Sequence, residues 1–216
     1  MSPSLPGRRK TGPKPTFSLA DVVAAAVKIG LDRMTLAAVA QELGVAAPSL
    51  YRVVSSREDL LDRCMARAAQ DLVLPDPGLP WQQQLRDYAN ACWDLHSRYP
   101  GLTTALIQVP GAHAHIQDYL DKLIAGLRQV DIPANDERIH FTIDFIADTV
   151  LITHLFVQTM RSQTAAGDPA LQVARERLAA QRPDGDVHFP AEECWLDRGF
   201  LDEKIDFIIA GIEAGH

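Results

Sequence analysis

Apolar residues in the first third of the chain recur at helical spacing. From Leu19 to Val27 they fall at i, i+3 and i+4, and Ser18 precedes them with Asp21 three residues later, the arrangement of a capping box. This pattern predicts an amphipathic helix that begins after Ser18 and ends near Gly30.

Three further helices are expected before the first proline-rich segment. One covers residues 35–43 and stops at Gly44, and the next begins at Ala47 or Pro48, because proline is tolerated in the first turn of a helix. A longer helix is predicted over Ser56–Leu74, with Ser56 as its N-cap.

The clearest linker in the sequence follows, and it contains Pro75, Pro77, Gly78 and Pro80. Beyond it no apolar pattern of period two persists, so the fold class is predicted to be all-α. Helices are expected over 81–99, 102–109, 114–130, 134–160 and 199–214, with one short helix between 167 and 185.

The segment 134–160 is apolar on more than one side. Its length of about 27 residues corresponds to roughly 40 Å of helix. The apolar residues cover too wide an arc for a helix with one buried face. Two different surfaces should therefore bury it, and one of them could belong to another subunit.

Charge is divided unevenly along the chain. The whole chain of 216 residues has a net charge of −7, yet residues 1–57 hold eight Lys or Arg against three Asp or Glu, whereas residues 58–216 carry −12. A basic end that meets phosphates and an acidic remainder that keeps the molecule off nonspecific DNA would show this asymmetry. A merely solvated basic tail would show it as well.

Residues 36–53 have the spacing of a helix-turn-helix. Two helices that cross closely need a small residue at the crossing, and Ala40 provides it. Gly44 follows four residues later, where the turn needs a left-handed residue. The apolar residues that would lock the second helix are Val39, Leu43, Val45, Leu50 and Val53. An ordinary helical hairpin would explain the glycine but not the full spacing.

The outward face of the second helix would then meet the major groove of DNA. Arg52 suits either guanine or a phosphate, and Ala47 and Pro48 suit a thymine methyl group. Residues with hydroxyl or guanidinium groups at helix starts are expected to contact phosphates. The predicted DNA-binding residues are Lys14, Thr35, Ala47, Pro48, Ser49, Tyr51, Arg52 and Arg57.

The segment 18–65 resembles the TetR family of repressors. The resemblance rests on Leu43-Gly44-Val45, Leu50-Tyr51, Val53-Val54 and the run Arg57–Leu61. It implies that Tyr51 and Arg57 clamp phosphates and that residues 8–14 reach along the DNA backbone or into the minor groove. Two departures stand out: valines at 53 and 54 replace the family's His or aromatic pair, and Ala46-Ala47 replaces polar residues.

A looser resemblance extends into the C-terminal part. It runs through Trp81, Leu85, Arg86 and Tyr99 and through 200–213, which looks like the closing helix of the tetracycline repressor subgroup. In that subgroup the last two long helices form a four-helix bundle with those of a second copy. The resemblance therefore implies a homodimer through the helices at 134–160 and 199–214.

Together these features predict three parts. They are a basic disordered arm at 1–17, a three-helix helix-turn-helix DNA-binding domain at 18–74 that binds palindromic operator double-stranded DNA, and a larger ligand-binding and dimerisation domain at 81–216. The expected function is a transcriptional regulator that a small molecule releases from DNA, and the resemblance implies a repressor. Neither repression nor activation follows from the residues alone.

The expected effector is a small apolar or aromatic molecule. Alignment from the anchors above places Tyr88, Cys92, Leu106 and Val73 where tetracycline-binding members carry polar, metal-linked or histidine ligands, so tetracycline with magnesium is not expected. The predicted ligand-binding residues are Tyr88, Cys92, Trp93, His96, Leu106, Asp148 and Ile152. The aromatic residues among them could equally be core.

Other chemistries have weaker support. His113-Ala114-His115 lacks a third and fourth ligand nearby, and the three cysteines form no CxxC pair, so no metal site, disulfide or cofactor is expected. An all-α enzyme with His154 and Asp148 as a base would lack any accompanying nucleophile motif or phosphate loop. Asp144, Asp148 and His154 could serve either the pocket or the dimer interface.

Two broader expectations complete the picture. No stretch approaches the roughly 18 uninterrupted apolar residues of a membrane helix, and the N-terminus lacks the apolar segment of a signal peptide. These observations predict a cytoplasmic protein without a membrane partner. A constitutive DNA-binding dimer without an effector is the alternative within the same family, and a cavity would argue against it.

Overall fold

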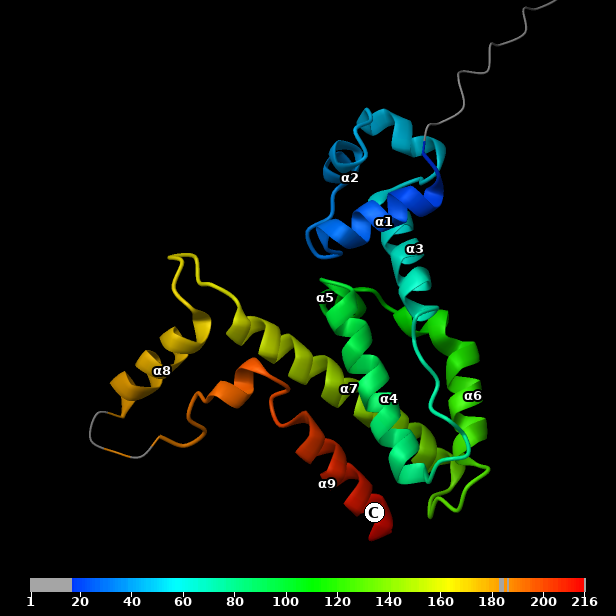
Figure 1. The fold of residues 1–216 in the computed structure, drawn as a ribbon, viewed down its shortest axis with the longest axis vertical. Coiled ribbons are helices and arrows are strands. Elements are labelled where there is room, and N and C mark those ends of the chain that lie inside the picture. The colour runs from blue at the N-terminus through cyan, green and yellow to red at the C-terminus, as the bar shows by residue number, and fades with distance from the viewer. Residues whose placement is uncertain (1–16, 183–184, 186, 216) are drawn as a thin grey trace, which may run out of the picture.

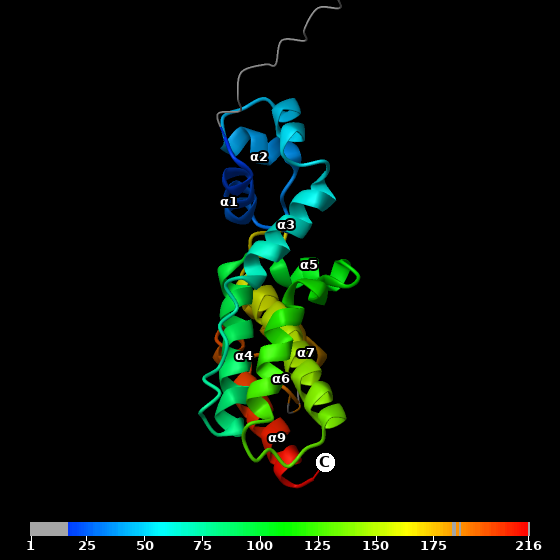
Figure 2. The same cartoon turned by 90° about the vertical axis from the view of Figure 1, so that its right-hand side faces the viewer.

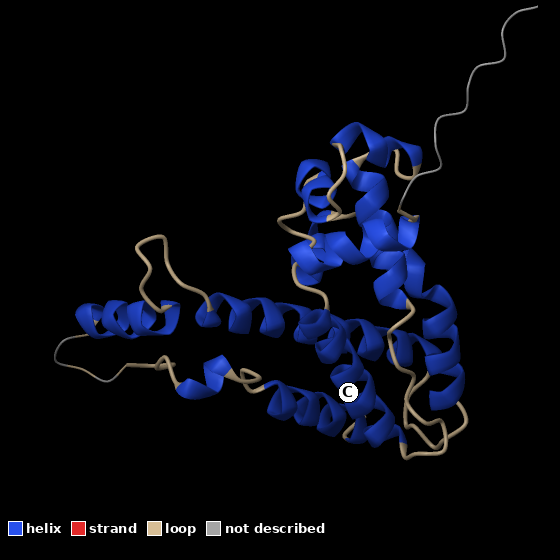
Figure 3. Ribbon diagram, turned by 45° about the horizontal axis from the view of Figure 1, so that its top comes forward, coloured by secondary structure: helices blue, strands red, loops and turns tan. Residues whose placement is uncertain are grey.

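The computed structural model describes residues 17–182, 185 and 187–215. Figure 3 shows helices and loops and no strand among these residues, which confirms the all-α prediction. The elements are α1 (Leu19–Ile29), α2 (Leu36–Glu42), η1 (Ala47–Arg52), α3 (Arg57–Ala69), α4 (Trp81–Arg98), α5 (Leu102–Gln108), η2 (Ala112–Ile116), α6 (Gln117–Leu127), α7 (Asp136–Arg161), α8 (Ala170–Gln181), η3 (Glu193–Leu196) and α9 (Leu201–Glu213), where η marks a 3₁₀ helix.

The helices form two bodies joined by α3. Figures 1 and 2 show α1 and α2 at one end of the molecule, and α3 running from them toward the larger body of α4, α6, α7 and α9. Each body has its own hydrophobic core. The N-terminal core also includes Tyr99, Leu102 and Ala105, so the junction between α4 and α5 packs against the N-terminal body.

Local hydrogen bonds explain why the N-terminal helices begin where the sequence predicts. Ser18 and Asp21 form a reciprocal capping box at α1. The hydroxyl groups of Thr35 and Ser56 accept hydrogen bonds from backbone N–H groups three residues later, at the starts of α2 and α3. Gly44, with φ of +66°, ends the α2 segment in the left-handed conformation. These predictions are confirmed.

The α3 helix is shorter than predicted. It ends at Ala69 instead of Leu74, and a loop carries the chain to α4. Tertiary contacts hold this loop: the hydroxyl groups of Tyr99 and Tyr119 donate to the Asp71 carboxylate and to the Val73 carbonyl, at 2.9 and 3.0 Å. The buried side chain of Gln84 also donates to the carbonyls of residues 77 and 79. The sequence of residues 70–74 alone does not indicate these contacts with the two tyrosines and the glutamine.

The second helix of the predicted helix-turn-helix is a 3₁₀ helix. Its backbone bonds span three residues, as in Ser49 N–H to Ala46 carbonyl (2.8 Å) and Val53 N–H to Leu50 carbonyl (2.9 Å). A six-residue segment with proline in its first turn forms few i to i−4 bonds, and short pieces of this kind favour the tighter form. Further along, the predicted helix over 114–130 is divided into η2 and α6, and η3 was not predicted.

The long helix α7 has two apolar stripes on different sides. One stripe is buried within the chain and includes Ile139, Ile143, Ile146, Val150 and Val157. The other is exposed and consists of Phe141, Phe145, Ile152 and Phe156. The prediction of a surface buried inside the chain is thus confirmed, and the exposed stripe is the second apolar surface.

By length and composition alone, α7 is also apolar enough to cross a membrane, and it is the one such helix among the described residues. Core helices of water-soluble proteins pass the same test.

Candidate DNA-binding surface and effector cavity

The helix-turn-helix has the packing that its spacing predicts. Val39, Ala40 and Leu50 are buried, and the half-buried side chains of Leu43, Val45 and Val53 pack against the same core. Val54, which was not in the predicted set, is buried as well. The N–H of Val45 donates to the Ala40 carbonyl across the turn, at 2.9 Å. The small residue therefore lies at the crossing, and η1 is fixed against α2.

The predicted base-reading residues lie at the outside of this unit. Pro48, Tyr51 and Arg52 are exposed, Tyr51 by 61%, while Ala47 and Ser49 are half-buried. Thr35 is exposed and caps α2. Lys14 lies outside the described residues. The exposed side chains of η1 thus present apolar surface, a hydroxyl group and a guanidinium group together.

Arg57 has a structural role that the sequence did not predict. Its Nε donates to the carbonyl of Met34 at 3.0 Å, and its Nη2 to the carbonyl of Leu31 at 3.4 Å. These bonds tie the start of α3 to the loop between α1 and α2. The guanidinium group is half-buried, and two of its nitrogens are engaged inside the protein.

A cavity of about 430 Å³ lies where α3, α4, α5 and α7 meet the segment 109–116. Of the seven predicted ligand-binding residues, the structure brings five to this cavity: Tyr88, Cys92, His96, Leu106 and Asp148. Asp144, which the sequence left open between pocket and dimer interface, lines it too.

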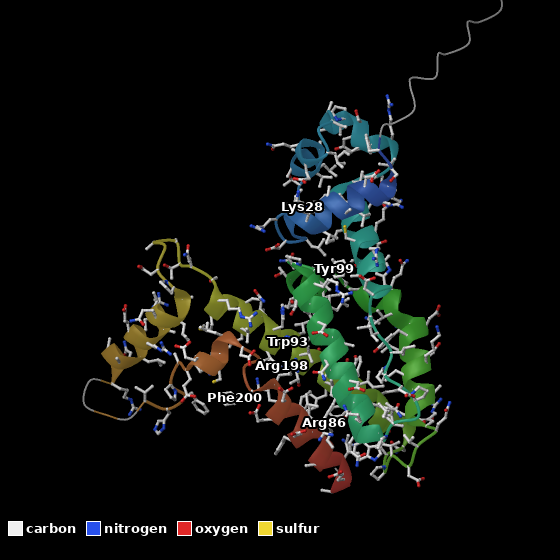
Figure 4. The ribbon with its side chains drawn as sticks, in the orientation of Figure 1. Lys28, Arg86, Trp93, Tyr99, Arg198 and Phe200 are labelled. Carbon is white, nitrogen blue, oxygen red and sulfur yellow. The ribbon has the colours of Figure 1, made fainter. Side chains whose placement is uncertain are left out.

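Trp93 and Ile152 do not line the cavity. The Trp93 ring packs edge-on against the His154 ring, with 5.0 Å between centroids, and the guanidinium of Arg198 lies 5.2 Å from the Trp93 ring (Figure 4). Ile152 is 58% exposed, on the outer stripe of α7. The helical pattern placed both residues on helices that line the cavity, Trp93 on α4 and Ile152 on α7. Each of them, however, lies on a different face of its helix from the cavity.

The cavity includes residues that sequence reasoning missed. Its wall contains Met65, Ala68 and Ala69 from the last turns of α3, together with Leu72. His113 and His115 also line it, and His115 Nε2 lies 2.9 Å from the Asp62 carboxylate of α3. Within the described ranges no group of three or more His, Cys, Asp or Glu residues could hold a metal ion. The only sequence signal was the apolar stripe of α3, which continues past the N-terminal core.

Burial keeps the inner polar groups of the cavity uncharged at neutral pH. Desolvation raises the pKa of the Tyr88 hydroxyl well above its ordinary value and raises the pKa of the Cys92 thiol to about 12. Desolvation, with a smaller contribution from the neighbouring His154, lowers the pKa of His96 to about 4. The inner wall therefore offers neutral hydrogen-bonding groups, and the exposed carboxyl groups of Asp144 and Asp148 stand toward solvent.

A second cavity, of about 510 Å³, lies between the two bodies. Its wall combines Asp32 and Arg33 of the loop after α1, the Pro100–Thr104 corner between α4 and α5, and the last turns of α7. The N–H of Leu31 donates to the Pro100 carbonyl at 2.7 Å across this junction. His96 lines both the cavity within the C-terminal body and the cavity between the bodies.

An N-terminal helix-turn-helix joined through one helix to a larger helical body with a cavity is an arrangement typical of DNA-binding transcriptional regulators. Residues 19–64 match the family model for the N-terminal domain described as "Bacterial regulatory proteins, tetR family". The N-terminal body is therefore similar to the DNA-binding domain of TetR-family regulators.

Among curated proteins, the chain is 33% identical over 135 residues to the HTH-type transcriptional repressor DrrR1 of Streptomyces coeruleorubidus. The match covers 58% of this chain and 49% of DrrR1, so the chain spans about half the length of that relative.

Solved structures share the fold over nearly the whole chain. The Streptomyces coelicolor protein ActR in complex with actinorhodin has a TM-score of 0.70 at 21% identity, covering 93% of this chain and 97% of ActR. BioQ with its double-stranded DNA operator has a TM-score of 0.56 at 17% identity, covering 92% of this chain and 99% of BioQ. These likenesses show the fold of both bodies.

Proposed function

We propose that this protein is a transcriptional repressor that binds a palindromic operator as a homodimer and is released by a small-molecule effector. The observation that carries the proposal is the cavity of about 430 Å³, because α3, which leaves the helix-turn-helix directly, forms part of its wall. A molecule in this cavity therefore contacts the helix that holds the DNA-binding unit.

The DNA-binding half of the proposal rests on exposed groups and charge. Pro48, Ser49 and Arg52 of η1 are proposed to face base edges, and Tyr51 and Thr35 to contact phosphates. Residues 1–57, with a balance of +5, supply the attraction to the backbone. BioQ, a relative in fold, has been solved with its DNA operator, which supports this use of the fold.

The proposed homodimer rests on exposed aromatic side chains. The outer stripe of α7 is exposed, and on the neighbouring helix α9 Phe207 is 80% exposed. Soluble monomers rarely expose contiguous apolar surface of more than a few hundred Å². A second copy that packs its own α7 and α9 against these helices would cover them and would place two helix-turn-helix units for two half-sites, about 34 Å apart or a multiple of that spacing.

Release is proposed to act through the last turns of α3 and through α5. An effector that contacts Ala68, Ala69 and Leu106 touches both helices at once. Since α3 ends at Ala69, the effector contacts the final turn of this helix directly. The longer helix to residue 74 that the sequence predicted would have extended beyond this contact. The coupling required is about 1 to 3 kcal/mol, and it must be reciprocal.

The relatives support a small apolar or aromatic effector. ActR has been solved both with actinorhodin and with (S)-DNPA, so a member with this fold accommodates small molecules. We also propose the domain boundaries 1–17, 18–74 and 81–216, and action in the cytoplasm, where operator DNA is found. Residues 99–105 contribute to the N-terminal core from the C-terminal side of this boundary.

Selection from a random duplex library at low salt, without effector, tests the DNA half of the proposal. We expect a pseudo-palindromic sequence whose affinity falls linearly with salt on logarithmic axes, at a slope near −0.9 per phosphate neutralised. Analytical ultracentrifugation of Phe207→Asp against the solvent-facing control Glu203→Gln tests the dimer. Failure to select any preferred sequence would contradict the DNA-binding half of the proposal. A Phe207→Asp protein that is as dimeric as the Glu203→Gln control would contradict the proposed dimer.

A further inference from the structure

Three buried side chains form a hydrogen-bonded chain between α4, α5 and α7. The Thr103 hydroxyl oxygen lies 3.0 Å from Nδ1 of His96 and 3.0 Å from Nδ1 of His154. All three side chains are buried. Both imidazoles are neutral at pH 7, since desolvation lowers the pKa of each to about 4. Each ring therefore carries one proton, on one of its two nitrogens.

The Thr103 hydroxyl has one proton and two acceptor lone pairs, so it can donate to only one Nδ1, although it could accept from both. Accepting from both would leave its own buried proton without an acceptor in this chain of contacts, which costs free energy. The favoured arrangement therefore has one histidine protonated at Nδ1 and the other at Nε2. The surroundings of His154 decide which is which.

His154 is the ring protonated at Nδ1. Its Nε2 lies 3.4 Å from the Gln158 amide nitrogen, a group that donates and cannot accept, and 3.5 Å from the Ser97 hydroxyl. Nε2 of His154 therefore accepts, and its Nδ1–H donates to Thr103. The Thr103 hydroxyl in turn donates to Nδ1 of His96, which leaves the proton of His96 on Nε2.

That proton has no acceptor inside the described part of the chain. The His96 side chain makes one hydrogen bond there, the one at Nδ1, and its ring lines the effector cavity. Among the described residues the one buried side-chain nitrogen or oxygen without a partner is Arg198 Nε, so His96 Nε2 is accessible from a cavity. A bound molecule that places an acceptor there can form a hydrogen bond with it in place of water.

We propose that His96 is a specificity-determining residue whose Nε2–H, fixed by Thr103 and His154, donates a hydrogen bond to an oxygen acceptor, such as a ring carbonyl, on the effector. This inference rests on the proposed effector function of the cavity. The remaining wall near His96 is largely apolar, with Leu95, Leu102 and Leu106 among its members. The favoured class of effector is therefore an apolar compound that carries a carbonyl oxygen.

The protonation pattern can be tested without any ligand. ¹⁵N NMR of the full-length protein with labelled histidines at pH 7 should show His96 protonated at Nε2 and His154 protonated at Nδ1. In Thr103→Val the pattern of His96 should become mixed, whereas Thr103→Ser, which keeps the hydroxyl, should preserve it. His96 protonated at Nδ1 in the unmodified protein would overturn the proposal.

The ligand preference is tested with a matched pair, 9-fluorenone and fluorene, which differ by one carbonyl oxygen. The ratio of their Kd values should shift against fluorenone by about fivefold in His96→Phe, the effect of one neutral hydrogen bond. The shift should be similar in Thr103→Val and small in Thr103→Ser. The control His113→Phe, which alters another histidine of the same wall, should leave the ratio unchanged.

The outcomes separate the two proposals. If both compounds bind and the ratio is the same in wild type, His96→Phe and Thr103→Val, His96 is not the donor, and the effector site itself stands. If neither compound binds, the proposed site for apolar ring effectors fails, and the inference fails with it. A lowered carbonyl stretching frequency of bound fluorenone, restored to its free value in His96→Phe, would support the direct hydrogen bond.

Discussion

The two hydrophobic cores of this molecule differ in what they leave open. The N-terminal core packs α1, α2, η1 and α3 around buried side chains, and the hollow of about 620 Å³ along α1 and α3 is lined largely by exposed residues such as Ala24, Lys28 and Gln70. The C-terminal core leaves a cavity among its own helices and an exposed aromatic stripe on α7. The proposed function accounts for this difference: a unit that reads DNA needs one fixed shape, whereas a body that responds to a ligand and to a second subunit needs surfaces that other molecules complete.

The largest effect is expected at the corner where the two cores meet. Gly101 has φ of +82°, and a Cβ atom there would overlap the backbone nitrogen and the carboxyl group of Asp32. Gly101→Ala should therefore separate the bodies or strain both, with a loss of about 3 to 4 kcal/mol in unfolding free energy. Urea unfolding measures it.

Gly111→Ala is the matched control for that substitution. Gly111 has a similar φ of +75° and nothing within 4 Å of a built Cβ, so only backbone strain of about 1 kcal/mol is expected. Equal losses in the two variants would show that the contact with Asp32 contributes little to the junction.

Acid should weaken the C-terminal core first, because no histidine precedes residue 96. The pKa values of His96 and His154 are lowered from 6.5 to about 4 by burial. Below pH 6.5 these two histidines therefore bind protons in the unfolded chain but not yet in the folded protein. Stability that is present at pH 7 is lost as the pH falls toward 4. Between pH 7 and 5 the loss should be roughly 1 to 2 kcal/mol per histidine.

The measurement is unfolding by urea at pH 7 and pH 5, in wild type and in His96→Phe. Between pH 7 and pH 5 the unfolding free energy of His96→Phe should fall less than that of wild type, and the difference should equal the loss expected for one histidine. His113→Phe, at a histidine with no buried partner, serves as the control. An identical loss in wild type and His96→Phe would contradict the assignment.

Within the N-terminal core, Arg57→Ala should cost about 1.5 to 2 kcal/mol of stability, because two carbonyls lose a charged donor. Arg63→Ala, which removes a partly exposed i,i+4 pair with Asp59 on the same helix, should cost about 0.3 to 0.5 kcal/mol. Thermal unfolding distinguishes them. A stable Arg57→Ala protein that binds every DNA sequence more weakly would instead favour the phosphate contact alone.

The smallest effect on the fold, and a specific one on DNA, is expected from Arg52→Ala. The variant should fold normally and should lose about 1 to 3 kcal/mol of affinity for the preferred operator, with relaxed specificity at one base pair in each half-site. Anisotropy titrations against single-base operator variants measure it. A loss that is the same for all sequences would make Arg52 a phosphate contact.

The sequence predicted most where the cause of structure is local. The helix starts at Ser18, Thr35 and Ser56 follow from capping hydrogen bonds within three residues, and Gly44 indicates the turn that it forms. The predicted end of α3 at Leu74 was wrong, because Tyr99 and Tyr119, which are distant in sequence, form hydrogen bonds with the loop that follows Ala69. Of the four residues predicted on α4, Tyr88, Cys92 and His96 line the cavity and Trp93 does not, because helical spacing gives a face but not the rotation that separates Trp93 from Cys92.

The most direct test of the central claim is reciprocity between the cavity and the operator. A ligand that stabilises the protein thermally is titrated against the free protein and against the protein–operator complex, with Leu106→Trp as a variant that fills the cavity. The account predicts that ligand and operator weaken each other by the same factor, about 5- to 150-fold, and that Leu106→Trp loses the ligand while it keeps operator binding. Ligands that bind in the cavity and leave operator affinity unchanged would contradict it and would favour a constitutive DNA-binding dimer.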